Sequence, residues 1–317
     1  MKLLQITKLA IVFLLLITFF IGCEKDEDND VADPFISGLI SDVNSDSIQS
    51  YVEWLQGMGT RFMLANNKKQ VAELIQNKFI SLGFTEVKID SFLNSRMFNE
   101  VTYQTWQYNV VATIYGIGDP SNYCIIGAHY DTYTKDSDLF SYSPGANDNA
   151  SGVAAVLEIA RILQKQSFHP LKTIQFVTFA AEELGLYGSW DFADKSARSQ
   201  KNISMMINFD MIAHWPDNDP TKWTVNIINY DNSTTLKSKA KKACSLYTEL
   251  ASINDNTDFN RSDSYLFFRY GYPAIYYTSS FDDNTYHTSD DKVENCNFDY
   301  CSEVVKASCA LVVQENI

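Results

Sequence analysis

The 317-residue sequence is poor in basic side chains. It has 25 Lys and Arg against 39 Asp and Glu, a formal net charge of −14, and no cluster of Lys or Arg offsets the acidic excess. Phosphate backbones repel a chain of this charge. We therefore expect no nucleic-acid partner.

Cysteine is also scarce, and its spacing offers no thiolate metal site. The six cysteines include no C-x-x-C pair, so a zinc site of the cysteine-rich kind is not supported. Apart from Cys23 there are five, an odd number, which leaves at least one thiol free even in an oxidising compartment. Cys296 and Cys301 are the candidate pair for a disulfide.

The one long apolar run lies at the N-terminus. Lys2 and Lys8 give a basic start, and residues 9–21 (LAIVFLLLITFFI) are apolar but short for the roughly 20 residues of a stable membrane span. A small residue directly before Cys23 resembles the bacterial lipoprotein signal, in which the leader is removed and the cysteine is acylated. One departure is Phe20, where leucine is usual in such signals.

We accordingly predict a lipoprotein signal peptide over residues 1–22 and a lipid anchor to a membrane through Cys23. The alternative is an uncleaved anchor helix. Both place the body of the chain outside the cytoplasm, on the periplasmic side or at the surface of a bacterial cell.

Residues 24–33 (EKDEDNDVAD) are acidic and polar, as in a solvated tether, and we assign residues 23–35 to it. Beyond the tether there is no internal repeat and no proline- or glycine-rich linker. Residues 36–317 are therefore expected to form a single domain.

Strand-like and helix-like segments alternate through most of this domain. The expected helices cover 45–57, 67–82, 150–166, 185–196, 233–248, 265–270 and 300–313, and the expected strands cover 86–92, 100–115, 124–129, 173–180, 203–211, 223–229 and 274–278. This order predicts an α/β fold, a three-layer sandwich with a central mixed, mostly parallel sheet flanked by helices. In such sheets ligands bind at the carboxyl ends of the strands.

Metal-capable side chains stand where three of the expected strands end. The strand 124–129 ends in His129-Tyr130-Asp131, the strand 173–180 is followed by Glu182 and Glu183, and the strand 203–211 holds Asp210 near its end. His129 and Asp131 are two residues apart in an extended segment and share a face, so Asp131 is placed to orient a ligating His129. Two adjacent carboxylates after a hydrophobic strand are costly unless a cation is present.

Two further candidates lie in loops. Asp148 occupies a polar turn before a helix, where an ordinary turn or N-cap aspartate is the simpler interpretation. His287 stands in a late loop, where a solvated histidine is equally ordinary. Taken together, two histidines and several carboxylates supply the mixed nitrogen and oxygen ligands suited to zinc. An aspartate shared between two metal ions would complete a two-metal hydrolytic site.

Five motifs then carry a resemblance. In order along the chain they are GAHYDT, GANDNASGVAAVLEIAR, FVTFAAEELGLYGS, INFDMI and YHTSDD. The sequence resembles the zinc-dependent exopeptidase family that contains bacterial leucyl aminopeptidases and, on the same fold, glutaminyl cyclases. Five ordered motifs are specific, and the resemblance covers most of the chain after about Ile48.

The resemblance implies a role for each candidate. His129, Asp148 and Asp210 would bind one zinc ion, and Asp148, Glu183 and His287 would bind a second, with Asp148 bridging the two. Glu182 would be the catalytic base and then the acid, and Asp131 would orient His129.

The chain also departs from the family pattern. In Ser262-Asp263-Ser264, Ser264 replaces a histidine that is usual in the family but is not one of these ligands, so the change bears on substrate contacts more than on metal binding. Near the last ligand, an aromatic set (Tyr276, Tyr277, Phe281 and Tyr286) is a candidate lining for an apolar side-chain pocket, with ordinary strand packing as the alternative for Tyr276 and Tyr277.

The expected function is that of a metallo-aminopeptidase, with two zinc ions per chain, acting on peptides with a free N-terminus. A glutaminyl cyclase-like acyltransferase with one zinc would not need His129 and Asp210 as ligands, and the presence of all five favours the peptidase. A non-catalytic surface binding domain on the same fold is the other alternative, but it would be expected to lose ligands or the base.

Overall fold

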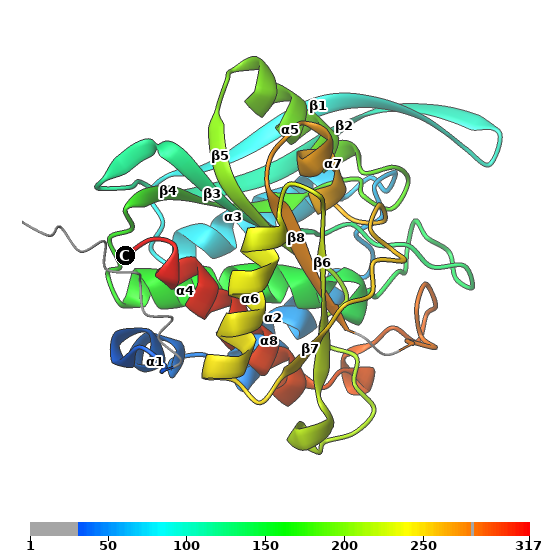
Figure 1. The fold of residues 1–317 in the computed structure, drawn as a ribbon. Coiled ribbons are helices and arrows are strands. Elements are labelled where there is room, and N and C mark those ends of the chain that lie inside the picture. Colours follow the sequence, from blue (N-terminus) through cyan, green and yellow to red (C-terminus); the bar gives the residue numbers. More distant parts are fainter. Residues whose placement is uncertain (1–30, 280–281) are drawn as a thin grey trace, which may run out of the picture. The chain divides into compact units, whose positions relative to one another are not determined.

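An eight-stranded mixed sheet runs through the computed structural model, which describes residues 31–279 and 282–317 (Figure 1). The strand order is β1-β2-β4-β3-β5-β8-β6-β7. The strands are β1 Val87–Phe98, β2 Val101–Ile114, β3 Asp119–His129, β4 Lys172–Phe179, β5 Asn202–Phe209, β6 Thr224–Asn229, β7 Ala251–Ile253 and β8 Ala274–Ser279. The central pairings β4–β3, β3–β5 and β5–β8 are parallel, as is β6–β7, whereas β1–β2, β2–β4 and β6–β8 are antiparallel.

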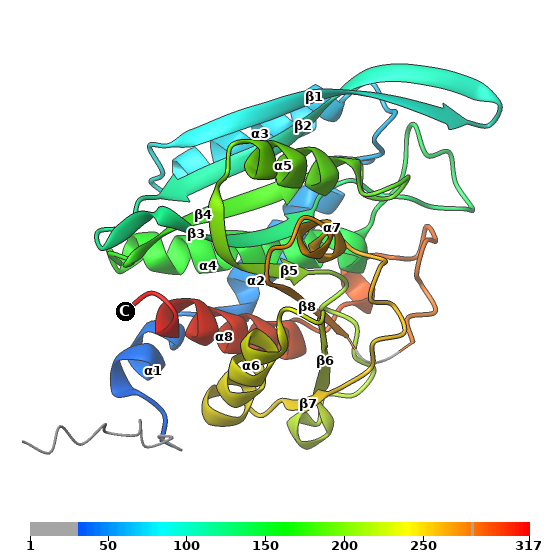
Figure 2. The same ribbon diagram turned by 45° about the horizontal axis from the view of Figure 1, so that its top comes forward.

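Helices cover both faces of this sheet. They are α1 Pro34–Ile40, α2 Ser45–Gln56, α3 Lys68–Ser81, α4 Gly152–Lys165, α5 Tyr187–Arg198, α6 Thr234–Tyr247, α7 Ser264–Arg269 and α8 Phe298–Gln314. One core joins the sheet to α1, α2, α3, α4, α6 and α8, and a smaller one joins the opposite face to α5 and α7 (Figure 2). The predicted three-layer α/β sandwich is confirmed.

The central strands are buried on both faces, and this explains their sequence. In β2, Val110 and Ala112 pack in the larger core, whereas Val111 points to the smaller one. Successive side chains of a strand face opposite sides of the sheet, so both cores need apolar residues from the same strand. Continuous apolar runs such as residues 124–128 of β3 (CIIGA) are the result.

Several element boundaries differ from the prediction. β1 continues to Phe98, well past the predicted end at residue 92, because it pairs with β2 along a hairpin arm whose polar, exposed residues do not follow the pattern of a buried strand. β5 ends at Phe209, and α4 begins only at Gly152, since residues 146–151 form a separate turn. Helix α1 and the short strand β7 were not predicted.

At the N-terminal side, α1 begins at Pro34 with Asp33 as its N-cap, two residues before the predicted domain boundary at residue 36. The predicted signal peptide, Cys23 and the tether up to residue 30 lie outside the described residues. Within the described parts of the chain, no helix is long and apolar enough to cross a membrane. Cys296 and Cys301 are free in this structure, as are Cys124, Cys244 and Cys309, so the candidate disulfide is absent.

Candidate metal centre and active site

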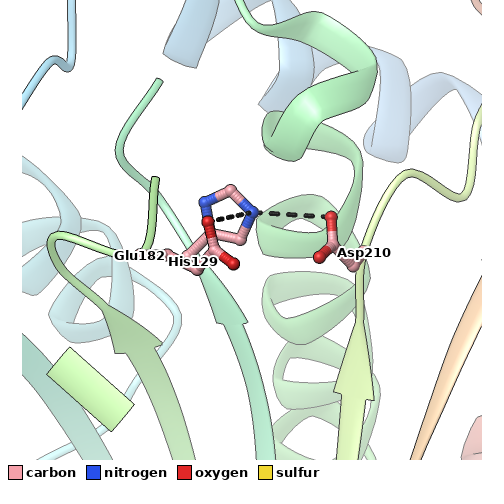
Figure 3. Close-up of side chains that lie close together, drawn as sticks. All are labelled: His129, Glu182 and Asp210. Carbon is pink, nitrogen blue, oxygen red and sulfur yellow. Dashed lines mark ion pairs between the residues drawn. The ribbon is translucent and has the colours of Figure 1, made fainter. Parts of the chain in front are cut away.

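The carboxyl ends of three neighbouring parallel strands bring the first candidates together. β4, β3 and β5 are adjacent in the sheet; His129 ends β3, Glu182 and Glu183 follow β4, and Asp210 follows β5 directly. His129 Nε2 lies 3.4 Å from Asp210 Oδ1 and 4.0 Å from Glu182 Oε2 (Figure 3). Residues far apart in sequence thus meet at one edge of the sheet, as predicted.

Asp148 lies between the two histidines. Its Oδ1 is 3.4 Å from His129 Nε2, and its Oδ2 is 3.2 Å from His287 Nε2. The same His287 nitrogen is 2.9 Å from Glu183 Oε2. One carboxylate therefore faces both histidines with different oxygen atoms, and all five predicted ligands belong to one cluster.

Asp131 contacts both His129 and the glutamate pair. His129 Nδ1 is 3.2 Å from the carbonyl oxygen of Asp131 and 3.6 Å from its Oδ1. The carboxylate also accepts hydrogen bonds from the backbone N–H groups of Glu182 (2.9 Å) and Glu183 (3.3 Å). Asp131 consequently fixes the histidine ring and the segment after β4 at once, which extends the orienting role expected from sequence.

The turn that carries Asp148 (residues 146–151) is held from two sides. The backbone N–H groups of Asn147 and Asp148 donate to the two carboxylate oxygens of Asp291, at 2.7 and 2.9 Å. On the other side, Asn149 Nδ2 donates to the carbonyl oxygen of Phe209 at 2.8 Å. The Asp148–Asn149 peptide bond is cis. These contacts tie the turn to the end of β5 and to the loop that carries His287.

Arg61 is a buried cation beneath this turn, and it was not among the residues selected from the sequence. Its guanidinium donates to the carbonyl oxygens of Tyr130 (2.8 Å), Pro144 (2.9 Å) and Gly145 (2.7 Å), and to that of Leu55 (3.0 Å). Burial lowers the pKa of Arg61 to about 10, and nearby carboxylates act in the opposite direction, so the group stays charged at neutral pH. The Arg61 side chain thus links Tyr130, which follows His129, to Pro144 and Gly145, which precede the turn that carries Asp148.

Gly145 makes this packing possible. Its φ is +52°, and a Cβ at this position would lie 2.3 Å from Thr132 Cγ2 and 2.4 Å from the carbonyl oxygen of Asp148. A larger residue would have to displace backbone next to a candidate ligand.

His287 is held in its loop by aromatic neighbours and by the backbone. The Tyr286 ring stacks on the imidazole with centroids 3.8 Å apart, and the Tyr133 ring meets it edge-on at 5.1 Å. The carbonyl oxygen of His287 accepts a hydrogen bond from the N–H of Lys135 at 2.9 Å. A solvated loop histidine would need none of these contacts.

The electrostatics of the cluster call for a cation. Burial, reinforced by the neighbouring Asp148, raises the pKa of Glu183 to about 8, and burial raises the pKa of Glu182 well above its usual range. Burial also acts on Asp148, but the two histidines hold the pKa of its carboxyl below its usual range. Within the described residues, Oε1 of Glu183 has no hydrogen-bond partner. Buried carboxylates this close together are unfavourable unless a positive ion compensates them, and their nitrogen and oxygen donors fit zinc.

A cavity of about 510 Å³ opens directly onto the cluster. Tyr276 and Tyr286 line it, but Tyr277 does not: it is buried in the larger core, where its ring stacks on Phe209 with centroids 5.8 Å apart. Phe281 lies outside the described residues. The remaining walls are mostly polar or acidic in the described part of the cavity. Tyr276 and Tyr286 thus line it as predicted, whereas the expected apolar character is not found there. The residues around it, apart from the candidate ligands and Glu182, are Met211, Asn226, Ile253, Asp255, Thr257, Asp258, Arg261, Tyr276, Thr278, Ser279, Asp282, Asp283 and Tyr286.

Ser264, which stands where the resembling family usually has histidine, is not at the cavity surface. It begins α7, is buried, and its hydroxyl lies 2.8 Å from Tyr230 Oη. This position is therefore used for packing at the end of the smaller core.

Among curated proteins, the chain is 32% identical over 240 residues to a probable zinc metalloprotease of Pyrenophora teres f. teres (strain 0-1), an alignment that covers 70% of the chain and 50% of that protein. It is 26% identical over 282 residues to a probable leucine aminopeptidase of Arthroderma otae, covering 86% of the chain and 72% of that protein. The chain thus spans only about half the length of the first of these relatives.

Two solved structures share the fold. The LapA aminopeptidase of Legionella pneumophila superposes with a TM-score of 0.74 at 22% identity, covering 88% of the chain and 74% of LapA. The glutaminyl cyclase of Fimbriiglobus ruber gives a TM-score of 0.68 at 18% identity, covering 85% of the chain and 95% of the cyclase.

The family assignment rests on a match to more than half of the chain. Residues 109–312 match peptidase family M28, and this segment contains every candidate ligand, Glu182 and Asp131. The chain belongs to peptidase family M28.

Proposed function

We propose that this protein is a zinc-dependent aminopeptidase that hydrolyses the peptide bond after a free N-terminal residue. The observation that carries the proposal is the buried cluster of five nitrogen and oxygen ligands, with Glu182 beside it, at the inner end of a cavity. The names of the relatives, a zinc metalloprotease and a leucine aminopeptidase, support the same activity.

We infer that the cluster holds two zinc ions. His129, Asp148 and Asp210 would bind one, and Asp148, Glu183 and His287 would bind the other. Support comes from Asp148, whose two oxygens face different histidines, as a bridging carboxylate requires. When bound, the ions polarise the scissile carbonyl and lower the pKa of the attacking water.

Glu182 is the group placed to move the proton. Its carboxylate lies beside His129, and the Asp131 carboxylate holds its backbone N–H. We infer that Glu182 takes a proton from the water whose oxygen bonds to the carbonyl carbon, and then delivers this proton to the leaving amine as the C–N bond breaks. Asp131 keeps His129 and the Glu182 segment in register during both transfers.

A glutaminyl cyclase-like reaction is the second candidate, because a cyclase shares the fold. It would need only Asp148, Glu183 and His287. The approach of both His129 and Asp210 to within 3.4 Å of one another argues for the second metal position and hence for hydrolysis.

We also propose, on the N-terminal sequence alone, that the protein acts outside the cytoplasm with a lipid on Cys23. Mass spectrometry of the N-terminal peptide after expression in a bacterium would test this. A diacylglyceryl cysteine as the first residue is the expected result, and an unmodified N-terminus beginning at Met1 would contradict it.

The direct test of the reaction is Glu182→Gln in the full chain purified in detergent. The variant should keep its zinc and lose about 100- to 10,000-fold in kcat on aminoacyl amides, because only the proton carrier is removed. Glu86→Gln, at an exposed position, is the matched control and should behave as the parent protein. Unchanged hydrolysis in Glu182→Gln would refute the assignment of the base. Glutamine cyclisation without amide hydrolysis in the parent protein would favour the cyclase.

A further inference from the structure

We propose that the cavity selects peptides whose N-terminal residue carries a cationic side chain, lysine or arginine. This inference rests on the proposed aminopeptidase function and names its substrate class.

The position of the cavity determines which part of a substrate enters it. One end is the ligand cluster, where the scissile carbonyl must lie for hydrolysis. The rest extends between the strands β6 and β8 and the segment 253–261, which follows β6 and α6 in the chain. With the carbonyl at the ligands, the side chain of the N-terminal residue is the group that reaches this outer part.

The outer part is not built for a leucine side chain. Among the described lining residues, Met211 and Ile253 are the aliphatic ones, whereas Asn226, Thr278 and Ser279 present polar groups from the strand ends. Burying a branched apolar side chain against amide and hydroxyl groups gains less than burying it in an apolar wall.

Charge in the outer part is strongly one-sided. Four carboxylates line it, those of Asp255, Asp258, Asp282 and Asp283, against the single guanidinium of Arg261. Arg261 is paired with Asp258, since its Nη1 lies 3.0 Å from Asp258 Oδ1. Arg261 is the one lysine or arginine side chain among the described residues that line the cavity, and this ion pair offsets its charge.

Two of those residues differ in how far they are satisfied. Asp283 is buried, accepts a hydrogen bond from Asn147 Nδ2 at 2.8 Å, and lies 3.5 Å from His214 Nδ1. Asp255 is exposed to the cavity and accepts from the N–H and the hydroxyl of Thr257, both on Oδ1. Its second oxygen is therefore the acceptor that a cationic side chain would meet.

Asp255 is held in place by the sheet. Asn226 of β6 is buried and makes a reciprocal pair of hydrogen bonds with the Asp255 backbone: its Nδ2 donates to the carbonyl oxygen at 2.7 Å, and its Oδ1 accepts from the N–H at 3.0 Å. Tyr276 of β8 donates through its hydroxyl to the carbonyl oxygen of Asp258 at 3.2 Å. Asp255 and Asp258, which we call the acidic rim, are thus anchored to two strands whose side chains also form the cavity wall.

The buried end of the cavity is negatively charged as well, although the proposed zinc ions would take up that charge. The Glu183 side chain is only 4% exposed and lines the cavity, and its Oε1 has no hydrogen-bond partner among the described residues. The cavity is therefore acidic at both ends: the proposed metal ligands lie at one end, and at the other lie Asp282 and the second oxygen of Asp255. A lysine or arginine side chain would extend past Tyr276 and Tyr286, which line the cavity, and place its charged head beside Asp255.

The experiment compares kcat/KM for lysyl, arginyl, norleucyl, leucyl and glutamyl amides with the full chain. We expect lysyl and arginyl amides to exceed the norleucyl amide, which is neutral and has the same carbon stem as lysine, by about tenfold, with the glutamyl amide slowest. The advantage should shrink as salt is raised from 0.05 to about 0.5 M, because the rim is exposed to solvent.

The double variant Asp255→Asn with Asp258→Asn sharpens the test. It should lower kcat/KM for the lysyl amide about tenfold and leave the norleucyl amide within about twofold. Asp119→Asn, at the opposite end of β3 from His129, is the control and should change neither substrate.

The outcomes separate the two proposals. Faster hydrolysis of leucyl than of lysyl amides, or an equal effect of the double variant on all substrates, would overturn the cationic preference and leave the aminopeptidase standing. No hydrolysis of any amide would overturn the proposed function, and the preference with it.

Discussion

The two walls of the cavity differ in burial. The ligand wall consists of the five candidate ligands, Glu182 and the residues that support them, and the substrate wall consists of the other residues that line the cavity. The ligand wall is buried and supported by further contacts: His129 and Asp131 have side chains only 1% exposed, and Asp148 is held by Asp291 and by the contacts of Arg61. The substrate wall combines buried strand side chains, such as Asn226, with exposed ones, 51% exposed at Asp258 and 58% at Arg261. Charges interact more strongly in the buried wall, where water does not screen them. We therefore assign the proposed hydrolysis to the ligand wall and the proposed substrate preference to the more exposed substrate wall.

This comparison predicts that substitutions in the ligand wall act on every substrate, whereas substitutions in the substrate wall act only on some. The predictions below run from the largest expected effect to the smallest.

The largest effect is expected from Asp148→Ala. Removing the carboxylate that lies between both histidines should abolish zinc retention and lower kcat/KM by about 1,000-fold or more for every aminoacyl amide. Zinc content and hydrolysis would be measured on the same preparation, with Asp46→Ala, on α2 away from the site, as the control. Retention of two zinc ions per chain would contradict the bridging role.

Arg61→Met should act through the geometry of the ligand wall. Four carbonyl oxygens lose their donor, so we expect a loss of about 3–5 kcal/mol in the free energy of unfolding and about 10- to 100-fold weaker zinc binding. Denaturant unfolding and zinc titration against a chelator would measure the two effects. Arg61→Lys should recover part of both, because an ammonium can still reach some of these oxygens; equal zinc affinity in all three proteins would show that Arg61 has no part in positioning the ligands.

The smallest effect belongs to the substrate wall. Arg261→Gln removes the cation paired with Asp258 and should raise kcat/KM for the lysyl amide about two- to threefold at low salt, with no change for the norleucyl amide. Initial rates at two ionic strengths would measure it. A fall in lysyl hydrolysis would mean that Arg261 helps to bind the substrate instead of competing with its charge.

The success of prediction from the sequence also differs between the two walls. Most ligands could be predicted because they stand at the ends of strongly apolar strands, and neighbouring parallel strands bring those ends together. His287 was a candidate from the residues only as a member of the whole set, and the resemblance assigned it to one metal ion, since nothing in a loop sequence indicates its spatial neighbours.

Residues that support the ligands were not predicted. Arg61 and Asp291 act through contacts with segments 69 to 144 positions away in the chain, and neither local propensity nor periodicity reports on such contacts. A basic residue in a short segment between two helices is ordinarily solvated, so its burial is a result of tertiary structure.

The substrate wall shows where the sequence interpretation failed. Tyr276 and Tyr277 were placed in one candidate lining, with strand packing as the alternative. Neighbours on β8 face opposite sides of the sheet, and the alternative holds for Tyr277, which belongs to the core. The acidic residues Asp255 and Asp258 were missed because they lie on an irregular segment, which the pairing of β7 with β6 and the Asn226 contacts bring to the cavity.

The central claim is that the buried cluster binds two zinc ions for amide hydrolysis. The measurement that tests it most directly is zinc titration of metal-depleted full-length protein, with hydrolysis of aminoacyl amides followed at each step. The account predicts that activity rises up to two equivalents of zinc and is complete there, and that Glu182→Gln binds the same two equivalents without activity. Saturation at one equivalent with no amide hydrolysis, or no tight zinc binding at all, would contradict it.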